Sequence, residues 1–156
     1  MKKISVFVSF VLITTVLHSN VPINASNSSD KVKAPCRLEV DYAHISSGKL
    51  KIEGRKFVKV KARSICTVPQ RQVTITLKIM KLGEFYDHEV RTFRTDPLAI
   101  SSSGLRVEMN NAFVRCKNSR RTLYFGIATS KALVGGQWVY AGETYSINPK
   151  PLDCGT

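Results

Sequence analysis

Residues 73–79 read Val73-Thr-Ile-Thr-Leu-Lys-Ile79, and their pattern indicates the kind of fold. Aliphatic residues occupy every second position, and Thr, Thr and Lys stand between them. Because successive side chains of a strand point to opposite faces of a sheet, this alternation predicts a strand with one face in a core and the other in water. The β-branched residues Val and Ile also favour strands.

Similar alternation recurs on both sides of this stretch, and residues that favour turns separate the segments. Pro69 predicts a loop before residue 73, and Asn110-Asn111 predicts a turn. No apolar recurrence at three- and four-residue spacing follows the N-terminal region, so no helix is expected. The chain is predicted to be all-β, an antiparallel immunoglobulin-like β-sandwich of about 7–9 short strands. The predicted strands include Leu38–Tyr42, Lys49–Glu53, Phe57–Ile65, Leu105–Met109 and Thr122–Thr129.

The N-terminal region has the pattern of a secretory signal peptide. Met1-Lys-Lys3 is basic, Ile4–Leu17 is apolar and uncharged, and Ala25 offers a small residue for cleavage. We therefore expect a signal peptide at residues 1–25, a flexible polar leader at 26–35 and the β-sandwich domain at 36–156. The protein is expected to be secreted or associated with the cell surface, and retention of the signal segment as an anchor is the alternative.

Four cysteines follow the signal segment, and an even number in an exported chain predicts two disulfides. Three connectivities are open. Antiparallel pairing of the strands that flank the cysteines favours Cys36–Cys66 and Cys116–Cys154. The cysteine spacing does not resemble a zinc site, and no metal or other cofactor is expected.

Cysteines, glycines and the quoted strand together form a pattern that covers essentially the whole mature chain. Its residues are Cys36, Gly54, Cys66, Val73-Thr-Ile-Thr-Leu77, Cys116, Gly135-Gly136, Tyr140, Gly142 and Cys154-Gly155. In this pattern the chain resembles small exported, disulfide-bonded β-sandwich proteins of actinobacteria, most of which lack an assigned activity. The resemblance implies architecture and export, and little chemistry.

The formal net charge is +13, which favours anionic partners. Lys59, Lys61 and Arg63 alternate with apolar residues and are predicted to project from one face of a strand. Lys49 and Lys51 are expected on a neighbouring strand. These five cations form a candidate anion-binding surface for an anionic cell-envelope polymer or an extracellular protein. Nucleic acid is an unlikely partner, because aromatic residues that could stack on bases are not interleaved with the row.

The predicted function is that of a non-enzymatic binding module, and two alternatives remain open. His88, with a nearby carboxylate such as Glu89, could serve a small secreted nuclease-like hydrolase. However, adjacent residues of a strand face opposite ways, which separates His88 from Glu89. The segment from Cys66 to Arg71 could instead serve as the binding loop of a secreted protease inhibitor.

Overall fold

The quoted stretch forms the second half of β3 (Phe57–Lys81) in a computed structural model that describes residues 35–156. Val73, Ile75, Leu77 and Ile79 are fully buried, which confirms the predicted core-facing side of this strand. The opposite side is less exposed than predicted, since Thr74 is also buried. The predicted signal peptide and all but the last residue of the predicted leader lie outside the described residues.

The described chain is mostly antiparallel β-sheet, as predicted. Eight strands pair in one connected sheet, and every pairing is antiparallel. The other elements are β1 (Cys36–Val40), β2 (His44–Ile45), α1 (Ser47–Glu53), β4 (His88–Arg94), the 3₁₀ helix η1 (Ile100–Ser102), β5 (Gly104–Arg115), β6 (Asn118–Val134), β7 (Gln137–Tyr145) and β8 (Lys150–Gly155).

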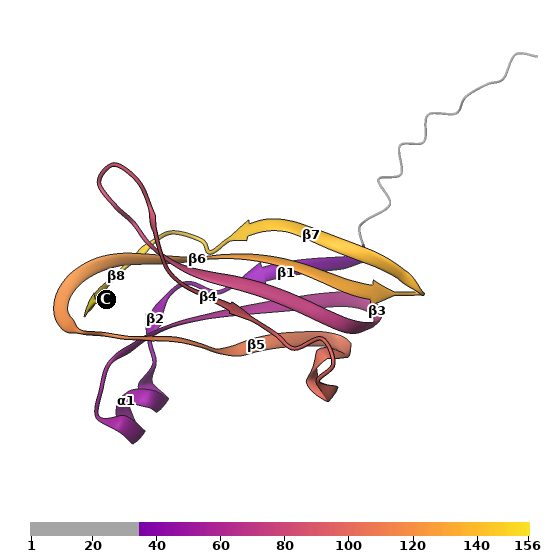
Figure 1. Ribbon diagram of the computed structural model, residues 1–156, viewed down its shortest axis with the longest axis horizontal. Helices are drawn as coiled ribbons and strands as arrows, with labels where there is room; N and C mark the ends of the chain where they lie inside the picture. The colour runs from indigo at the N-terminus through magenta and orange to yellow at the C-terminus, as the bar shows by residue number, and fades with distance from the viewer. Residues whose placement is uncertain (1–34) are drawn as a thin grey trace, which may run out of the picture. The chain divides into compact units, whose positions relative to one another are not determined.

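Strand β3 organises the sheet. Its first half pairs with β1, β2 and β5, and its second half pairs with β4 and β6. Strand β6 in turn pairs with β7 and β8. Figure 1 shows the long strands β3, β5 and β6 running alongside one another, with α1 and the β3–β4 loop projecting from them. With 25 and 17 residues, β3 and β6 are much longer than the short strands predicted.

The predicted loop at Pro69 is wrong, because β3 continues through it. Gln70 is completely buried at this point, and its Nε2 donates to the Ser64 carbonyl oxygen over 3.0 Å. The Ser64 hydroxyl donates back to Gln70 Oε1 over 2.8 Å. Two residues later Gln72 has φ of +50°, and the pairing with β6 shifts register between Arg71 and Thr74. The chain thus bends within the strand while the buried side chains of Gln70 and Ser64 stay hydrogen-bonded.

The predicted strand at Lys49–Glu53 is also wrong, because these residues lie in the short helix α1. Ser46 caps its N-terminus by accepting a hydrogen bond from the backbone of Lys49, and Gly54 ends it in the left-handed conformation. None of the helical residues is buried. The alternation of Lys, Leu, Lys and Ile therefore does not reflect a buried strand face. The capping residues Ser46 and Gly54 determine the local structure instead.

The predicted turn at Asn110-Asn111 is a bulge instead. Strand β5 is continuous, with Val60 opposite Ala112 and Ala62 opposite Met109. Two residues of β5 therefore occupy the place opposite Lys61 alone, which is the arrangement of a β-bulge. The strand pairs with β3 on both sides of the irregularity.

A close approach between β6 and the β1–β3 pair defines the core. A Cβ atom at Gly126 of β6 would lie 2.6 Å from Val60 Cγ1 and 3.0 Å from Val40 Cγ1. All three residues are buried, and β6 is not hydrogen-bonded to β1. The first half of β3 therefore packs face to face on β6, while the second half pairs with β6 edge to edge.

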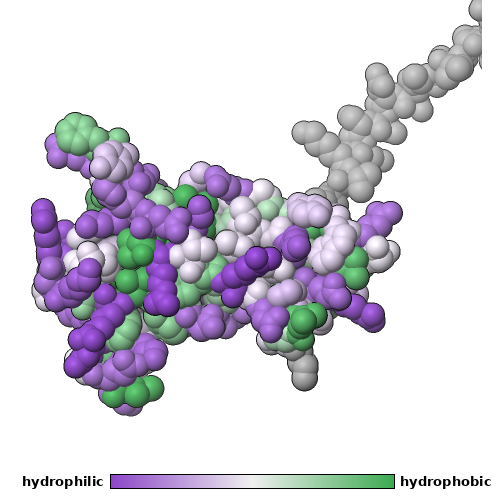
Figure 2. Space-filling model, viewed as in Figure 1, coloured by the Kyte–Doolittle hydropathy of each residue, from purple (hydrophilic) through white to green (hydrophobic). Residues whose placement is uncertain are grey.

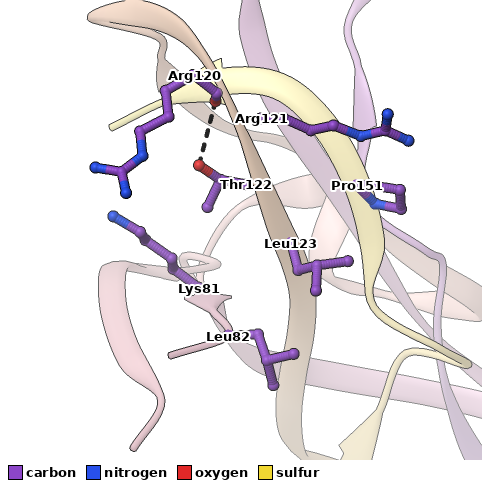
Figure 3. Close-up of a pocket in the computed structure, with 7 residues that line it drawn as sticks. All are labelled: Lys81, Leu82, Arg120, Arg121, Thr122, Leu123 and Pro151. Carbon is purple, nitrogen blue, oxygen red and sulfur yellow. Dashed lines mark hydrogen bonds between the residues drawn. The ribbon is translucent and has the colours of Figure 1, made fainter. Parts of the chain in front are cut away.

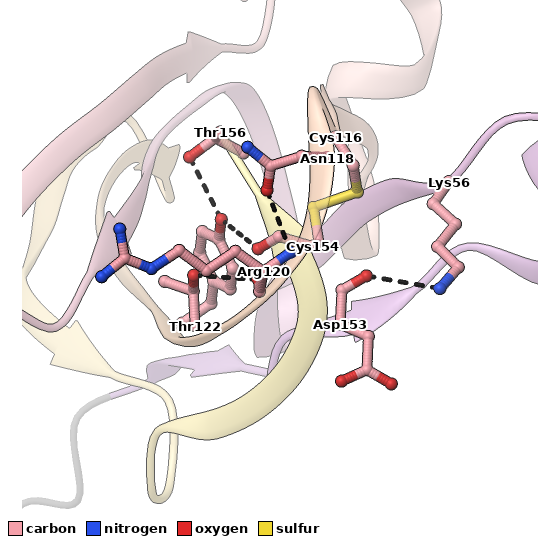
Figure 4. The surroundings of a disulfide bond; sticks show 9 residues. Lys56, Cys116, Asn118, Arg120, Thr122, Asp153, Cys154 and Thr156 are labelled. Carbon is pink, nitrogen blue, oxygen red and sulfur yellow. Dashed lines mark hydrogen bonds between the residues drawn. A yellow bond between two sulfur atoms is a disulfide. The ribbon is translucent and has the colours of Figure 1, made fainter.

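Both disulfides have the predicted pairing. Cys36 lies opposite Cys66 in the β1–β3 register, and Cys116 after β5 joins Cys154 of β8. Figure 4 shows the Cys116–Cys154 disulfide and its surroundings. The Tyr124 hydroxyl donates to the Cys154 carbonyl oxygen over 2.9 Å. The bridges span 30 and 38 residues, and loop entropy gives each about 3–4 kcal/mol of stabilisation.

The visible surface is mostly hydrophilic (Figure 2). Apolar atoms stand out where Figure 1 places the β3–β4 loop and α1, in agreement with the 90% exposure of Phe85 and the 83% exposure of Ile52. Within residues 35–156, no helix has the length and apolar character needed to cross a membrane.

The contact at Gly126 yields the first prediction. Gly126→Ala is expected to lower the free energy of unfolding by about 1–3 kcal/mol, because the added methyl group forces apart well-packed side chains. Denaturant unfolding measures the difference. Gly142→Ala on β7 is the matched control, since a Cβ there meets no atom within 4 Å. Equal unfolding free energies for the two variants would contradict the close packing of β6 on β1 and β3.

Candidate functional site

The predicted basic row on β3 is present. Lys59, Lys61 and Arg63 alternate with the buried residues Val58, Val60 and Ala62, so the three cations share the outward face. Lys49 and Lys51 lie on α1 rather than on a neighbouring strand. Because α1 stands beside the start of β3, Lys49 still comes close to this face.

A hollow of about 350 Å³ beside α1 brings three of the five predicted cations together; we call it the α1 pocket. The sheet register places His44 of β2 opposite Lys59 of β3, and Lys59 opposite Phe113 of β5. Helix α1 closes one side of this row. The residues that line the α1 pocket are His44, Ser46, Ser47, Gly48, Lys49, Ile52, Lys59, Lys61 and Phe113.

The ring of Phe113 holds two ammonium groups near one another. Lys59 Nζ lies 4.8 Å from the ring centroid and Lys49 Nζ lies 5.5 Å from it. At such distances the ring quadrupole attracts a cation, which offsets part of the loss of water around the lysines. Lys49 Nζ also contacts Glu53 Oε1 at 2.5 Å, so one of the two charges is partly balanced.

The electrostatics of the α1 pocket favour an anion. Burial lowers the pKa of Lys59 below its ordinary value of 10.5, and the neighbouring charge of Lys61 lowers it further. Across residues 35–156, no carboxylate forms a salt bridge with either lysine. No residue that lines the pocket is acidic. A bound anion would relieve the repulsion between these cations and stabilise the charged form of Lys59.

The other two predicted cations lie outside the α1 pocket. Arg63 contacts Glu39 Oε2 at 2.7 Å and Asp41 Oδ1 at 2.6 Å. The hydrogen bond to Glu39 raises the pKa of Arg63, while Arg37 and then Arg63 lower the pKa of Glu39. Arg63 is thus already neutralised. Lys51 is exposed on α1 and does not line the pocket.

Sequence reasoning missed Phe113. Along the chain no aromatic residue alternates with the basic row, but β5 places this ring directly opposite Lys59. The available signal was the strand register: pairing residues 112–115 with residues 57–60 would have brought the aromatic ring beside the lysines. A one-residue shift would have put it on the other face, and the bulge in β5 made that register hard to foresee.

The residues of the hydrolase alternative do not come together. His88 is exposed at the start of β4, with its ring centroid 4.5 Å from that of Tyr86. Glu89 accepts hydrogen bonds from Thr92 and Lys78, which lower its pKa and so make its carboxylate a poorer proton acceptor. His44 of β2, the other histidine among the described residues, lines the α1 pocket. Among the described residues, no group of three or more His, Cys, Asp or Glu side chains could hold a metal ion.

The segment of the inhibitor alternative is part of β3. Gln70 is buried and lies opposite both Gly104 of β5 and Val134 of β6. Arg71 is exposed but is likewise paired, with Leu133. An inhibitory loop needs a free backbone that a protease can bind, and here strand pairing already occupies much of it.

A second hollow of about 520 Å³ lies at the base of the β3–β4 loop (Figure 3). Lys81 and Arg120 extend toward one another across its opening, and Leu82 and Leu123 form an apolar side. The Thr122 hydroxyl donates to the Arg120 carbonyl oxygen over 3.2 Å. None of the five cations of the predicted anion-binding surface lines this hollow, which makes it a weaker candidate than the α1 pocket.

The chain matches none of the family models, curated proteins or solved structures with which it was compared. The function proposed below therefore rests on the residues themselves.

The repulsion between Lys59 and Lys61 leads to a measurable pKa change. Lys61→Gln is expected to raise the pKa of Lys59 toward 10.5, because the like charge that lowers it is gone. NMR titration of the lysine side chains measures the change. Lys51→Gln removes a charge outside the α1 pocket and should leave Lys59 unaffected. An unchanged Lys59 titration in Lys61→Gln would show that the two ammonium groups do not interact.

Proposed function

We propose that this protein is a secreted or cell-surface binding module, built as an immunoglobulin-like β-sandwich, that acts without catalysis. The α1 pocket is its contact with an anionic polymer of the cell envelope. The observation that carries this proposal is that Lys49, Lys59 and Lys61 line one pocket. Lys49 and Lys59 lie over the Phe113 ring, and of the three lysines only Lys49 has a carboxylate partner, Glu53, within the described residues.

Export is supported by the covalent structure. Two disulfides fit an oxidising, extracellular setting, where thiols do not stay reduced. The predicted signal peptide and the resemblance to small exported proteins of actinobacteria point the same way. In that setting the abundant polyanions are envelope polymers, whose repeated phosphate or carboxylate groups suit a cluster of lysines.

A polymer is a better match than a small ligand, because the α1 pocket lies over the outward face of β3, between β2 and β5, and opens to solvent. Lys59 and Lys61 are two residues apart on one strand, so their Cα atoms are spaced by about 6.6 Å. Neighbouring charges of an extended polyanion can contact both. Binding of this kind releases counterions, and its affinity should fall steeply with salt.

Retention on an immobilised sulfated or phosphorylated polymer tests the proposal. Lys59→Gln together with Lys61→Gln should weaken binding roughly 10- to 30-fold, if each lysine contributes about 1 kcal/mol near a polyanion. The salt concentration that elutes the protein should fall accordingly.

The matched control carries Lys51→Gln and Arg55→Gln, which remove the same number of charges from exposed positions beside α1 but outside its pocket. This variant should elute close to the wild type. Equal shifts for the two variants would mean that net charge alone causes retention. No shift for the pocket variant would remove the α1 pocket from the function.

A binding assay across pH offers an independent check. The lowered pKa of Lys59 means that its neutral fraction grows at a pH where an ordinary lysine, with a pKa of 10.5, remains charged. Retention should therefore weaken as pH rises through this window, and the Lys59→Gln variant should lose that part of the pH dependence. A wild-type profile identical to that of the variant would contradict a role for the Lys59 charge.

A further inference from the structure

A smaller hollow, of about 190 Å³, lies on a different surface of the sheet, across β3, β6 and β7. We call it the β7 hollow. It shares no residue with the α1 pocket. The residues that matter for its chemistry are Thr74, Thr76, Arg94, Thr129, Lys131 and Tyr140.

The strand register sets these side chains in two parallel rows. One row runs from Thr74 across Lys131 to Tyr140, and each residue lies directly opposite the next. The other row runs through Thr76, which lies opposite both Arg94 and Thr129. Because residues two apart on a strand share a face, both rows project from the same side of the sheet.

Two irregularities frame the β7 hollow. The β3–β6 pairing shifts register between Arg71 and Thr74, and the β6–β7 pairing shifts between Ala128 and Ser130. Bulges redirect side chains and are common beside binding sites. Here the two register shifts interrupt the regular pairing of the sheet beside the threonines that line the hollow.

Thr74 supplies an independent observation. Its side chain is buried, with only 4% exposed, although it lies on the outer side of a strand whose opposite side faces the core. Its hydroxyl is the one buried side-chain polar atom in the described part of the chain that lacks a hydrogen-bond partner. A buried hydroxyl without a partner is destabilising. Rotation about χ1 exchanges the positions of its hydroxyl and methyl groups, so the hydroxyl can turn to meet a ligand.

Aromatic rings border the same surface. Tyr140 is 70% exposed and lines the hollow, and Trp138 is exposed two residues earlier on the same face of β7. Lys131 Nζ lies 5.1 Å from the centre of the Trp138 ring. Flat rings give a ligand apolar contact at little conformational cost, and the surrounding hydroxyls can exchange hydrogen bonds with it.

From this combination we propose that the β7 hollow binds an acidic sugar, a pyranose ring that carries a carboxylate. The C–H face of the sugar packs on Tyr140, its hydroxyls pair with the threonines, and Arg94 and Lys131 bind the carboxylate. Arg suits this role because its guanidinium can meet both carboxylate oxygens. No lining residue is acidic, so nothing in the hollow repels the ligand charge.

This inference does not depend on the function proposed for the α1 pocket, and a direct titration tests it. Trp138 is the only tryptophan in the chain, so its fluorescence reports on β7 in the unlabelled, oxidised protein. D-glucuronate should change the emission in a saturable way, with a dissociation constant on the order of 1 mM for so small a ligand. D-glucose, which lacks the carboxylate, should bind at least about tenfold more weakly.

Calorimetric titration under the same conditions provides a second readout that needs no change at Trp138. The absence of binding in both measurements would overturn the proposal. Equal binding of glucuronate and glucose would overturn its acidic part. Competition by sodium sulfate as strong as that of glucuronate would show a simple anion site in place of a sugar site.

Three variants locate the ligand. Tyr140→Ala should abolish binding, while Tyr145→Ala, at an exposed tyrosine of the same strand outside the hollow, should not. Arg94→Gln should weaken the preference for glucuronate over glucose, because only Lys131 then remains to bind the carboxylate. Thr74→Val keeps the shape but removes the unpaired hydroxyl, so it should weaken binding severalfold and raise the melting temperature by a few degrees. Unchanged affinity in Thr74→Val or Tyr140→Ala would overturn the placement of the site.

Discussion

The buried hydrogen bonds between Gln70 and Ser64 are the interaction on which the rest of the structure depends. They hold the bend of β3, and β3 pairs with five other strands. Because the strand bends instead of ending, one chain segment sets the register of both parts of the sheet. The positions of both candidate sites depend on this register, since the α1 pocket lies on the first half of β3 and the β7 hollow borders the second half.

Local alternation in the sequence predicted much of this fold. It identified the buried faces at Val58–Ala62 and Val73–Ile79, and antiparallel pairing predicted both disulfides. Alternation gave the wrong local structure at α1 and at the β5 bulge. Ser46 and Gly54 cap a helix whose apolar and polar residues alternate as they would in a strand. Asn110 and Asn111 form a bulge inside β5. Turn-forming residues mark an irregularity, but whether the chain reverses there depends on partners far away in sequence.

The candidate sites were less accessible to prediction because they depend on register and on charge pairing. Five cations were expected to act together, but Arg63 is neutralised by Glu39 of β1 and by Asp41 just after it, both more than twenty residues earlier in the chain. Lys59 and Lys61 have no such partner in the described part of the chain. Which cations remain available to a ligand thus depends on which of them form salt bridges. Sequence composition does not show these pairings.

The positions of the two disulfides also determine how the molecule responds to tension. Cys36–Cys66 locks β1 to the first half of β3, and Cys116–Cys154 locks the chain after β5 to β8. Pulling on the ends of the described chain can lengthen only the segment between Cys66 and Cys116, which contains the second half of β3, β4 and all of β5. When force acts on the two ends, this segment yields first, because the crosslinks keep the loops on either side from being extended.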